Sequence, residues 1–583
     1  MMQNDITTAC PLDCYDACGV AYQDDKLKAL KACHTQGFLC PNLNHYLQYE
    51  TITTPRYKGK EISLDEAKIK LKEILEGSLK SEILHYRGHG NFSLMQEVTD
   101  HFFASYGAVL TDGTLCDGAG EAGIVEGRGS NKNMPLSEIA KSDVVIFWGR
   151  NPHTTSSHIL PLIKGKKIVV IDPVKTKIAK EADLFIQLKP HTDLYLAMLL
   201  TRFLHINDLC DTDFLEKYAS EFEEYYELTQ SIRIKAGLEE MGVTLGDLGT
   251  ILEMTKDAKV AIVCGVGIQK YSDGADVMRA IDAFGVALGL FGKEGCGVAY
   301  LGSSREKIEN PFYTKAKRVS KVNTEFERYK TVFIQGANPL SQMPNSLRVK
   351  QSFQSVENVV YFGLYENETS EVADLVIPAK SFLYKDDVRT SYSHNAMMMM
   401  NKQLESDVGL SEYELSSYLC DAFKIEIKAE KEYLEHFKNF GVQKINGCFE
   451  VEGREDIPYR DGFDTDDGEF IFLEEYEPLV SHMDEKCLIT SKSLKSLNSQ
   501  FQREECVYIH SSLGYKEGTQ LKISSDNGTL ILRVKHNDNL RDDCVLIYSG
   551  TRAVNNLTTS KHSLEGKCAI YQENRVTISK LEQ

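Results

Sequence analysis

The feature that most constrains the fold is an internal repeat of apolar runs. VVIFWGRNP at 144–152 and TVFIQGANP at 331–339 both end in Gly-x-Asn-Pro, and their glycines lie 187 positions apart (336 − 149). Each is followed by a second apolar run, KIVVIDP or NVVYFGLY, and then by ADLFI or ADLVI. Continuous apolar runs separated by helical segments are typical of buried parallel strands. The repeat therefore predicts an α/β chain with two related parallel-sheet halves.

The two Gly-x-Asn-Pro turns are candidate ligand sites. Ligands of doubly wound sheets bind at the carboxyl ends of the strands, which is where Gly149 and Gly336 lie. Glycine lets a ligand approach the backbone closely. Asp172 ends the run VVIDP and is placed to bind a ribose hydroxyl. Thr192 and Asp193 precede the amphipathic stretch LYLAMLLTRFL, and in the simplest interpretation one of them is its N-cap. Two such turns predict two related nucleotide sites.

A group of cysteines near the start suggests a metal. Cys10, Cys14 and Cys18 lie at four-residue intervals in CPLDCYDAC, and Cys40 follows in GFLCPN. Clustered cysteines in a reducing compartment suggest metal before disulfide. Structural zinc usually shows two Cys-x(2–4)-Cys pairs, so three close cysteines and one distant cysteine favour a [4Fe–4S] cluster. Zinc and four unconnected buried thiols are the alternatives, and Cys33 is a spare thiol nearby.

Composition excludes some partners. The 583 residues carry a net charge of −19, which argues against a nucleic-acid partner because phosphate binding needs clustered cations. The first residues, MMQNDITTAC, contain no basic or apolar export signal. No apolar run approaches the ~18 residues that a membrane span needs. We expect a cytoplasmic protein without membrane insertion.

The order of the motifs resembles a known family. CPLDCYDAC, GFLCPN, TLCDGAGEAG, WGRNP, VVIDP, PHTD, QGANP and ADLVIPA follow one another as in the molybdopterin oxidoreductases of the dimethyl sulfoxide reductase family, and most resemble the formate-dehydrogenase-like branch. The resemblance implies an α/β four-domain architecture with two pseudo-symmetric halves, an N-terminal iron–sulfur domain and a C-terminal six-stranded β-barrel. It also implies two molybdopterin guanine dinucleotides, one molybdenum or tungsten and one [4Fe–4S] cluster.

This architecture divides the chain into segments. We expect the iron–sulfur domain at 1–52, one α/β half at 53–112 plus 312–425, the other at 113–311, a linking region at 426–480 and the barrel at 481–583.

The resemblance also assigns cofactor residues by their match to the family's motifs. The first dinucleotide would contact Trp148, Gly149, Arg150, Asn151, Asp172 and Asp193. The second would contact Gly336, Asn338 and Pro339, and the barrel would add Asn555 and Asn556 at the pterin.

The catalytic candidates begin with Cys116 in TLCDGAGEAG. It stands where formate dehydrogenases carry a selenocysteine or cysteine metal ligand, and a soft thiolate suits Mo or W; a buried structural cysteine is the alternative. The small residues that follow, 118–120, would let a bulky cofactor approach. Asp117 would be a general base if burial raises its pKa, or would be hydrogen-bonded in the turn. His394 matches a histidine of some relatives and is otherwise an ordinary histidine.

Two departures from the family pattern bear on the substrate and the redox role. Asn42 stands in place of the usual lysine between cluster and pterin, and Gly302 aligns where formate dehydrogenases have an active-site arginine. The second departure argues against formate as the substrate.

The sequence therefore predicts a Mo- or W-dependent enzyme that oxidises or reduces a small substrate by two electrons and exchanges them with a partner protein. Two alternatives stay open. One is a non-redox, hydratase-like relative, which the loss of the lysine motivates. The other is a cluster-bearing scaffold subunit of a redox complex.

Overall fold

The computed structural model describes residues 7–30, 35–88, 93–406, 408–445, 447–478 and 485–581. The chain forms two compact units. Unit 1 contains Met1–Asp112, Ser304–Arg454 and Leu494–Arg503, and unit 2 contains Gly113–Ser303, Glu455–Ser493 and Glu504–Gln583.

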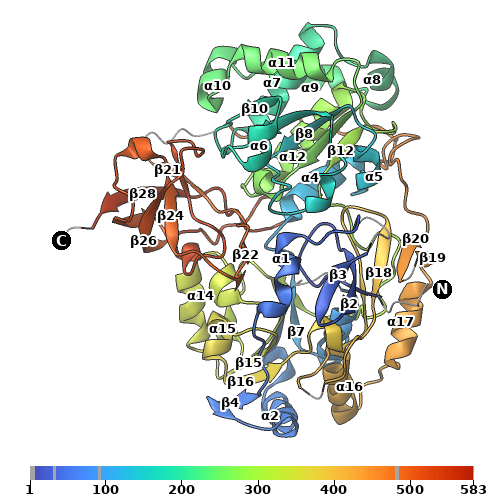
Figure 1. Cartoon of the computed structure of the whole chain (residues 1–583), viewed down its shortest axis with the longest axis vertical. Helices are drawn as coiled ribbons and strands as arrows, with labels where there is room; N and C mark the ends of the chain where they lie inside the picture. The colour runs from blue at the N-terminus through green and yellow to red at the C-terminus, as the bar shows by residue number, and fades with distance from the viewer. Residues whose placement is uncertain are drawn as a thin grey trace. The chain divides into compact units, whose positions relative to one another are not determined.

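Unit 2 is built on a five-stranded parallel sheet in the order β10-β9-β8-β11-β12 (Figure 1). Its central strand is the apolar run VVIFW, and every residue of that strand is buried. Valine and isoleucine favour strands because their branched side chains pack well on a pleated surface. The strands are β8 (Val144–Trp148), β9 (Lys167–Ile171), β10 (Leu184–Ile186), β11 (Val260–Cys264) and β12 (Gly297–Ala299).

Helices α4, α7 and α12 pack together in unit 2. A Cβ at Gly123 of α4 would lie 2.1 Å from the Ala275 carbonyl oxygen of α12, so only glycine allows this helix contact. Arg128 also reaches Asp282 of α12 through Nε at 2.7 Å. The helices of unit 2 are α4 (Gly118–Arg128), α5 (Leu136–Ile139), α6 (Lys177–Glu181), α7 (Asp193–Ile206), α8 (Thr212–Tyr218), α9 (Phe222–Thr229), α10 (Ile234–Met241), α11 (Leu245–Thr255) and α12 (Gly274–Ala287).

Unit 1 contains an eight-stranded sheet in the order β13-β7-β6-β14-β15-β16-β4-β5, parallel from β13 to β16. Its strands are β13 (Arg318–Ser320), β7 (Val109–Asp112), β6 (Ile83–Arg87), β14 (Thr331–Gln335), β15 (Asn358–Gly363), β16 (Leu375–Pro378), β4 (Arg56–Tyr57) and β5 (Lys60–Glu61). The helices of unit 1 are α1 (Pro41–Asn44), α2 (Leu64–Glu76), α3 (Val98–Tyr106), α13 (Pro339–Gln342), α14 (Ser346–Phe353), α15 (Glu368–Val372), α16 (Glu412–Phe423) and α17 (Glu430–Lys438).

The repeat in the sequence is a repeat in the structure. The order β10-β9-β8-β11 in unit 2 corresponds to β16-β15-β14-β6 in unit 1. Gly149 follows β8 with a φ of 62° and donates its N–H to the Ile171 carbonyl at 2.8 Å. Gly336 follows β14 with a φ of 53° and donates to the Phe362 carbonyl at 2.9 Å. The expected two pseudo-symmetric parallel-sheet halves are confirmed.

The Ala-Asp-Leu segments have the same role in both halves. The Asp183 carboxylate accepts the Ile168 N–H at 2.7 Å, and the Asp374 carboxylate accepts the Val359 N–H at 2.9 Å. Each aspartate therefore joins two neighbouring strands of its sheet, which explains why this residue recurs in the repeat.

Three small antiparallel sheets complete unit 1. The first contains β1 (Thr7–Ala9), β2 (Gly19–Gln23) and β3 (Lys26–Ala29). The second contains β17 (Asp387–Arg389), β18 (Ala396–Met400), β20 (Cys448–Val451) and β19 (Gly441–Ile445), and β22 (Ser496–Leu497) pairs separately with β23 (Gln500–Phe501). The four consecutive methionines of β18 are buried core residues.

The carboxyl-terminal part of unit 2 is the expected closed six-stranded barrel, shown in orange and red in Figure 1. Its strands, in order around the barrel, are β21 (Lys486–Ile489), β27 (Cys544–Leu546), β24 (Cys506–Ile509), β26 (Gly528–His536), β25 (Gln520–Ser525) and β28 (Arg575–Lys580).

The segment expected to link domains, 426–480, is not one linker. Its first part forms α17, β19 and β20 and belongs to unit 1, whereas residues from Glu455 belong to unit 2. Pairing of β20 with β18 explains the difference, because it makes this segment part of a sheet. Among the described residues, none of the helices combines the length and apolarity that a membrane crossing requires.

Candidate functional site

The four amino-terminal cysteines lie together in unit 1. Cys10, Cys14, Cys18 and Cys40 all belong to one apolar cluster. The Cys10 N–H donates to the Cys18 carbonyl at 2.7 Å, which closes the loop between them. Burial raises the pKa of Cys10, and the neighbouring Cys40 and Cys14 raise it further. Four adjacent thiols in an apolar setting fit an iron–sulfur cluster, whose positive metal ions would hold them as thiolates.

Residues that the sequence did not single out hold this loop. The fully buried Arg389 donates through Nη2 to the carbonyls of Leu12 at 2.7 Å and Cys14 at 3.3 Å. The Ser391 hydroxyl donates to the Tyr15 carbonyl at 2.8 Å. No motif marks either residue, because each acts on backbone more than 370 positions away.

His394 is also bound to the cysteine loop. Its Nε2 lies 2.5 Å from the Asp16 carbonyl, and its Nδ1 accepts the Ala396 N–H at 3.2 Å. Burial lowers the pKa of His394 to about 4. A neutral ring with both nitrogens engaged suits a positioning role, and we propose no proton transfer by it. Cys33 lies outside the described residues.

The loop that carries Cys116 is fixed by Gln269 in unit 2. The fully buried Gln269 donates through Nε2 to the Cys116 carbonyl at 2.8 Å, and its Oε1 accepts the Gly120 N–H at 2.9 Å. The Thr114 hydroxyl accepts the Cys116 N–H at 2.9 Å. The half-buried Cys116 is therefore presented from a loop whose backbone is held on both sides.

The small residues after Cys116 admit other parts of the chain. A Cβ at Gly118 would lie 2.5 Å from the Gly566 carbonyl oxygen, and one at Gly120 would lie 2.8 Å from the ring of Tyr300. At these two positions the missing side chains therefore make room for a backbone carbonyl and an aromatic ring of the protein. The buried Tyr300 hydroxyl has no hydrogen-bond partner among the described residues.

Asp117 is the half-buried N-cap residue of α4, and its side chain forms no capping hydrogen bond. Burial raises the pKa of Asp117 to about 6, and Glu121 adds to this, whereas Thr114 opposes it. The half-buried carboxyl group therefore titrates closer to neutral pH than an exposed aspartate.

The first Gly-x-Asn-Pro turn gathers several of the predicted cofactor residues. The fully buried Trp148 donates through Nε1 to Asp193 at 2.7 Å. The Asn151 side chain donates through Nδ2 to the Thr154 hydroxyl at 3.0 Å, but its buried Oδ1 has no hydrogen-bond partner among the described residues. The buried Arg150 contacts Ser156.

Two carboxyl groups near this turn are perturbed. Burial and then the proximity of Asp193 raise the pKa of Asp172 to about 7, and one oxygen of Asp172 accepts the Val174 N–H at 2.8 Å. Burial raises the pKa of Asp193 to about 6, although Trp148 and His191 oppose it. Asp193 begins α7, while the Thr192 hydroxyl donates to the Lys189 carbonyl and does not cap the helix.

The second turn differs from the first in its asparagine. Asn338 donates to Glu368 at 2.9 Å, and its carbonyl oxygen accepts the Thr369 hydroxyl at 2.8 Å. Both ends of its amide are therefore engaged by protein. Gly336, in contrast, faces open space, since nothing lies within 4 Å of a Cβ placed there, and Pro339 begins α13.

The barrel places its two predicted residues side by side. Asn555 and Asn556 end a short 3₁₀ turn after β27 and are buried. The Thr558 hydroxyl donates to the Asn555 side-chain oxygen at 3.1 Å.

A second glycine packs against the backbone of each turn. The sequence analysis did not single out either of these glycines. A Cβ at Gly265 would lie 1.8 Å from the Gly149 carbonyl oxygen, and one at Gly88 would lie 2.4 Å from the Gly336 carbonyl oxygen. Gly265 and Gly88 follow the equivalent strands β11 and β6. Each half therefore has a paired-glycine turn at the point where neighbouring strands end.

Comparison with known proteins agrees with this geometry. The family model for molybdopterin oxidoreductase matches residues 64–408. The chain is 28% identical over 442 residues to the "Probable oxidoreductase YyaE" of Bacillus subtilis, covering 69% of this chain and 66% of that protein. It is 25% identical over 317 residues to the F420-dependent formate dehydrogenase subunit alpha of Methanocaldococcus jannaschii, covering 47% of this chain and 46% of the subunit. The chain thus spans just under two thirds of the length of the first of these relatives.

A solved structure shares the fold. Acetylene hydratase from Pelobacter acetylenicus matches with a TM-score of 0.79 and 16% identity, covering 98% of this chain and 100% of that one.

Proposed function

Because the chain belongs to the molybdopterin oxidoreductase family, we propose that it is a Mo- or W-dependent oxidoreductase holding two molybdopterin guanine dinucleotides and one [4Fe–4S] cluster. The observation that carries this proposal is the pair of equivalent glycine turns, Gly149 with Gly265 and Gly336 with Gly88. Two copies of one turn suit two copies of one cofactor. When bound, the metal would supply two-electron oxidation or reduction of a small substrate, with electrons exchanged with a partner protein.

The residues of the first turn suit a nucleotide. The side-chain oxygen Oδ1 of Asn151, which has no partner among the described residues, would accept an N–H of a guanine or pterin ring. Trp148 and Asp193 hold each other in place through their hydrogen bond, which fixes the position of the Asp193 carboxyl group. The Asp172 oxygen that does not accept the Val174 N–H would bind a ribose hydroxyl.

The second turn would act differently. The amide of Asn338 is engaged by Glu368 and Thr369, so it would shape the turn and leave the backbone of Gly336 to face the cofactor. Asn555 and Asn556 would contact a pterin from the barrel.

Two sets of thiols would bind metal. Cys10, Cys14, Cys18 and Cys40 would hold the cluster, and Cys116 would be the protein ligand of Mo or W. Gln269 would position Cys116 through its backbone. Asp117, raised in pKa by burial, would hold or move a proton beside that ligand.

A second function is favoured by one residue. Asn42 carries no charge where electron-transferring members of the family have a lysine, and this change suits a non-redox, hydratase-like relative in which the metal acts as a Lewis acid. A cluster-bearing scaffold subunit is the third candidate function. The retention of Cys116 in a fixed loop argues against it.

Turnover of the protein purified without oxygen tests these functions. A panel of small substrates is assayed with oxidised and reduced viologen dyes and, separately, with no dye. Substrate-dependent dye oxidation or reduction that is lost in Cys116→Ala and kept in Cys210→Ala supports the oxidoreductase. Product formation without any dye supports the hydratase instead, and turnover by Cys116→Ala overturns the assigned ligand.

A further inference from the structure

Two cysteines of the barrel lie side by side in unit 2. Cys487 on β21 and Cys544 on β27 are register partners in parallel strands, and both are free thiols. Partners of this kind point to the same face, and neighbouring strands lie about 4.7–4.9 Å apart. A disulfide needs Cα atoms about 4.4–6.8 Å apart. The two positions therefore allow a disulfide without a shift of the backbone.

The pair lies on the outer face of the barrel. The residues that follow each cysteine belong to the apolar core inside the barrel. Cys487 and Cys544 belong to a separate apolar cluster with Leu540, against which Val174 packs. Because side chains alternate along a strand, the two thiols point out of the barrel towards the segment that follows β9.

Charged groups contact the two sulfurs in complementary positions. Arg575 of β28 donates through Nη1 to Sγ of Cys487. Sγ of Cys544 donates to Oδ1 of Asp543 at 3.3 Å. Arg541 holds that carboxylate through Nε at 2.9 Å and Nη2 at 2.8 Å. A cation therefore faces one thiol and an anion faces the other.

This asymmetry decides which thiol ionises. The hydrogen bond from Cys544 lowers the pKa of Cys487. Arg575 and Lys189 lower it further, whereas burial and Asp543 oppose them. The same hydrogen bond and burial raise the pKa of Cys544. Because the thiolate is the nucleophile in cysteine chemistry, Cys487 is the attacking sulfur and Cys544 keeps its proton.

The pair lies directly beneath polar side chains that reach solvent. Cys487 is 3% exposed and Cys544 is fully buried. The side chain of Asp543, which contacts Cys544, is 32% exposed. Local movement of such surface groups admits a molecule of two heavy atoms.

We propose that Cys487 and Cys544 form a reversible disulfide when the protein meets a hydroperoxide. With hydrogen peroxide, the Cys487 thiolate attacks one oxygen, so that an S–O bond forms, the O–O bond breaks and the departing hydroxide is protonated by solvent. The Cys544 sulfur then attacks Cys487, the S–S bond forms, and the second oxygen leaves as water with the Cys544 proton. The two thiols lose two electrons and the peroxide gains them. The inference rests on residues of the barrel and does not depend on the proposed cofactors.

Peptide mapping of the full chain tests the disulfide. Protein purified without oxygen is treated with hydrogen peroxide, alkylated and digested with trypsin. Cleavage after Lys and Arg places Cys487 in CLITSK (487–492) and Cys544 in DDCVLIYSGTR (542–552). We expect these two peptides to become linked, to reach a plateau with peroxide and to separate in dithiothreitol. Both cysteines still alkylated at the highest peroxide concentration, or a sulfinic acid at Cys487 without the link, would overturn the proposal.

Variants test the assigned roles. Cys487→Ser should abolish the link, and the matched control Cys506→Ser should keep it, because Cys506 is a buried barrel cysteine whose register partner is Arg533. Arg575→Met should slow the linking at pH 7 about fivefold, since less of Cys487 is then thiolate. An unchanged rate would contradict the role of Arg575. The wild-type measurement needs no substitution, so it tests the disulfide whether or not a variant folds.

Discussion

Gln269 shows how one side chain without a motif can define a candidate site. Its side-chain amide donates to the carbonyl of Cys116, the predicted metal ligand, and accepts the N–H of Gly120. Asp117 lies in the short segment between these two bonds. Because Gln269 is fully buried, no water can replace these bonds if the side chain is shortened or made apolar.

Replacing Gln269 with methionine should therefore loosen the Cys116 loop. The change leaves the Cys116 carbonyl and the Gly120 N–H unsatisfied, and about 1–3 kcal/mol of unfolding free energy is expected to be lost for each. Denaturant unfolding of the two proteins measures the loss. A variant as stable as wild type, with the same Mo or W content, would show that Gln269 does not hold the loop.

Asp100 gives a prediction about pH. Burial alone would raise its pKa, but the charge of Arg87, together with His85, outweighs burial and holds the pKa of Asp100 well below its usual range. A carboxyl group whose pKa is depressed on folding stabilises the fold above its unfolded pKa of about 3.9 and loses that contribution as pH falls further. Wild type should accordingly lose stability as the pH drops through this range.

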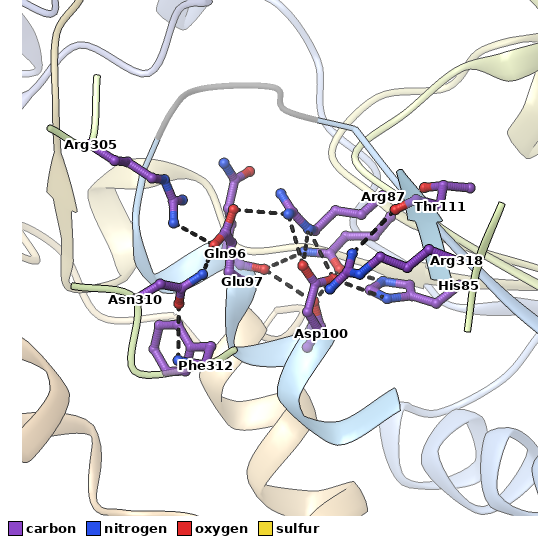
Figure 2. A network of polar contacts seen from close by, with 12 residues as sticks. His85, Arg87, Gln96, Glu97, Asp100, Thr111, Arg305, Asn310, Phe312 and Arg318 are labelled. Atoms are coloured by element: carbon purple, nitrogen blue, oxygen red, sulfur yellow. Dashed lines mark hydrogen bonds and ion pairs between the residues drawn. The ribbon is translucent and has the colours of Figure 1, made fainter. Parts of the chain in front are cut away.

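Asp100→Asn isolates that contribution. It leaves the half-buried Arg87 with Glu97 as its remaining carboxylate partner (Figure 2) and should cost about 3–5 kcal/mol near neutral pH. The difference between variant and wild type should shrink as the pH is lowered below about 4. Thermal unfolding from pH 7 to pH 3 checks both statements, and a difference that is constant over this range would contradict the assignment.

Among the elements, the two paired-glycine turns require residues without side chains. One pair follows β8 and β11, and the other follows β14 and β6. Gly265 lies against the carbonyl of Gly149, and Gly88 lies against that of Gly336. Because these contacts are with backbone, an added Cβ cannot be accommodated by rotation of a side chain.

Gly265→Ala and Gly88→Ala should each destabilise their own half, by about 1–3 kcal/mol or more. Gly249→Ala is the matched control, since it lies inside α11 with nothing within 4 Å of an added Cβ, and alanine favours helix. Melting temperatures compare the three variants. Melting temperatures of the two turn variants equal to that of the control would contradict the role of these glycines.

The cysteine loop before α1 depends on β17, where Arg389 ends the strand and donates to the loop's backbone. Arg389→Met should lower the iron content per chain, because the carbonyls of Leu12 and Cys14 lose their shared donor. Ser391→Ala removes one contact to the cysteine loop, the bond to the Tyr15 carbonyl, and should retain more iron. Iron analysis of anaerobically purified variants tests this, and equal iron in wild type and Arg389→Met would refute the role of Arg389.

For the whole molecule, the sequence predicts those features that a local pattern of residues encodes. The repeat of apolar runs predicts two related sheets because burial of parallel strands leaves a continuous apolar pattern. Gly149 and Gly336 were predictable for the same reason, as each directly follows such a run. The barrel followed from the resemblance of the motifs to a family.

Contacts between distant segments could not be read in this way. Gly88, Gly265 and Arg389 matter because of partners far away in the chain, and a residue leaves no local pattern when its role is set by a distant carbonyl. The pairing of β20 with β18, within the segment 426–480, leaves no local pattern either, since it depends on strands that come together only in the fold.

Cofactor content separates the oxidoreductase from the alternatives in one measurement. Protein purified without oxygen is analysed for iron, molybdenum, tungsten and zinc, and the guanine nucleotide released by acid is measured on the same sample. We expect about four iron atoms, about one Mo or W and about two guanines per chain. Iron without Mo, W or guanine would contradict the proposed oxidoreductase and favour a cluster-bearing scaffold subunit. Zinc in place of iron would show that the four thiols bind a different metal.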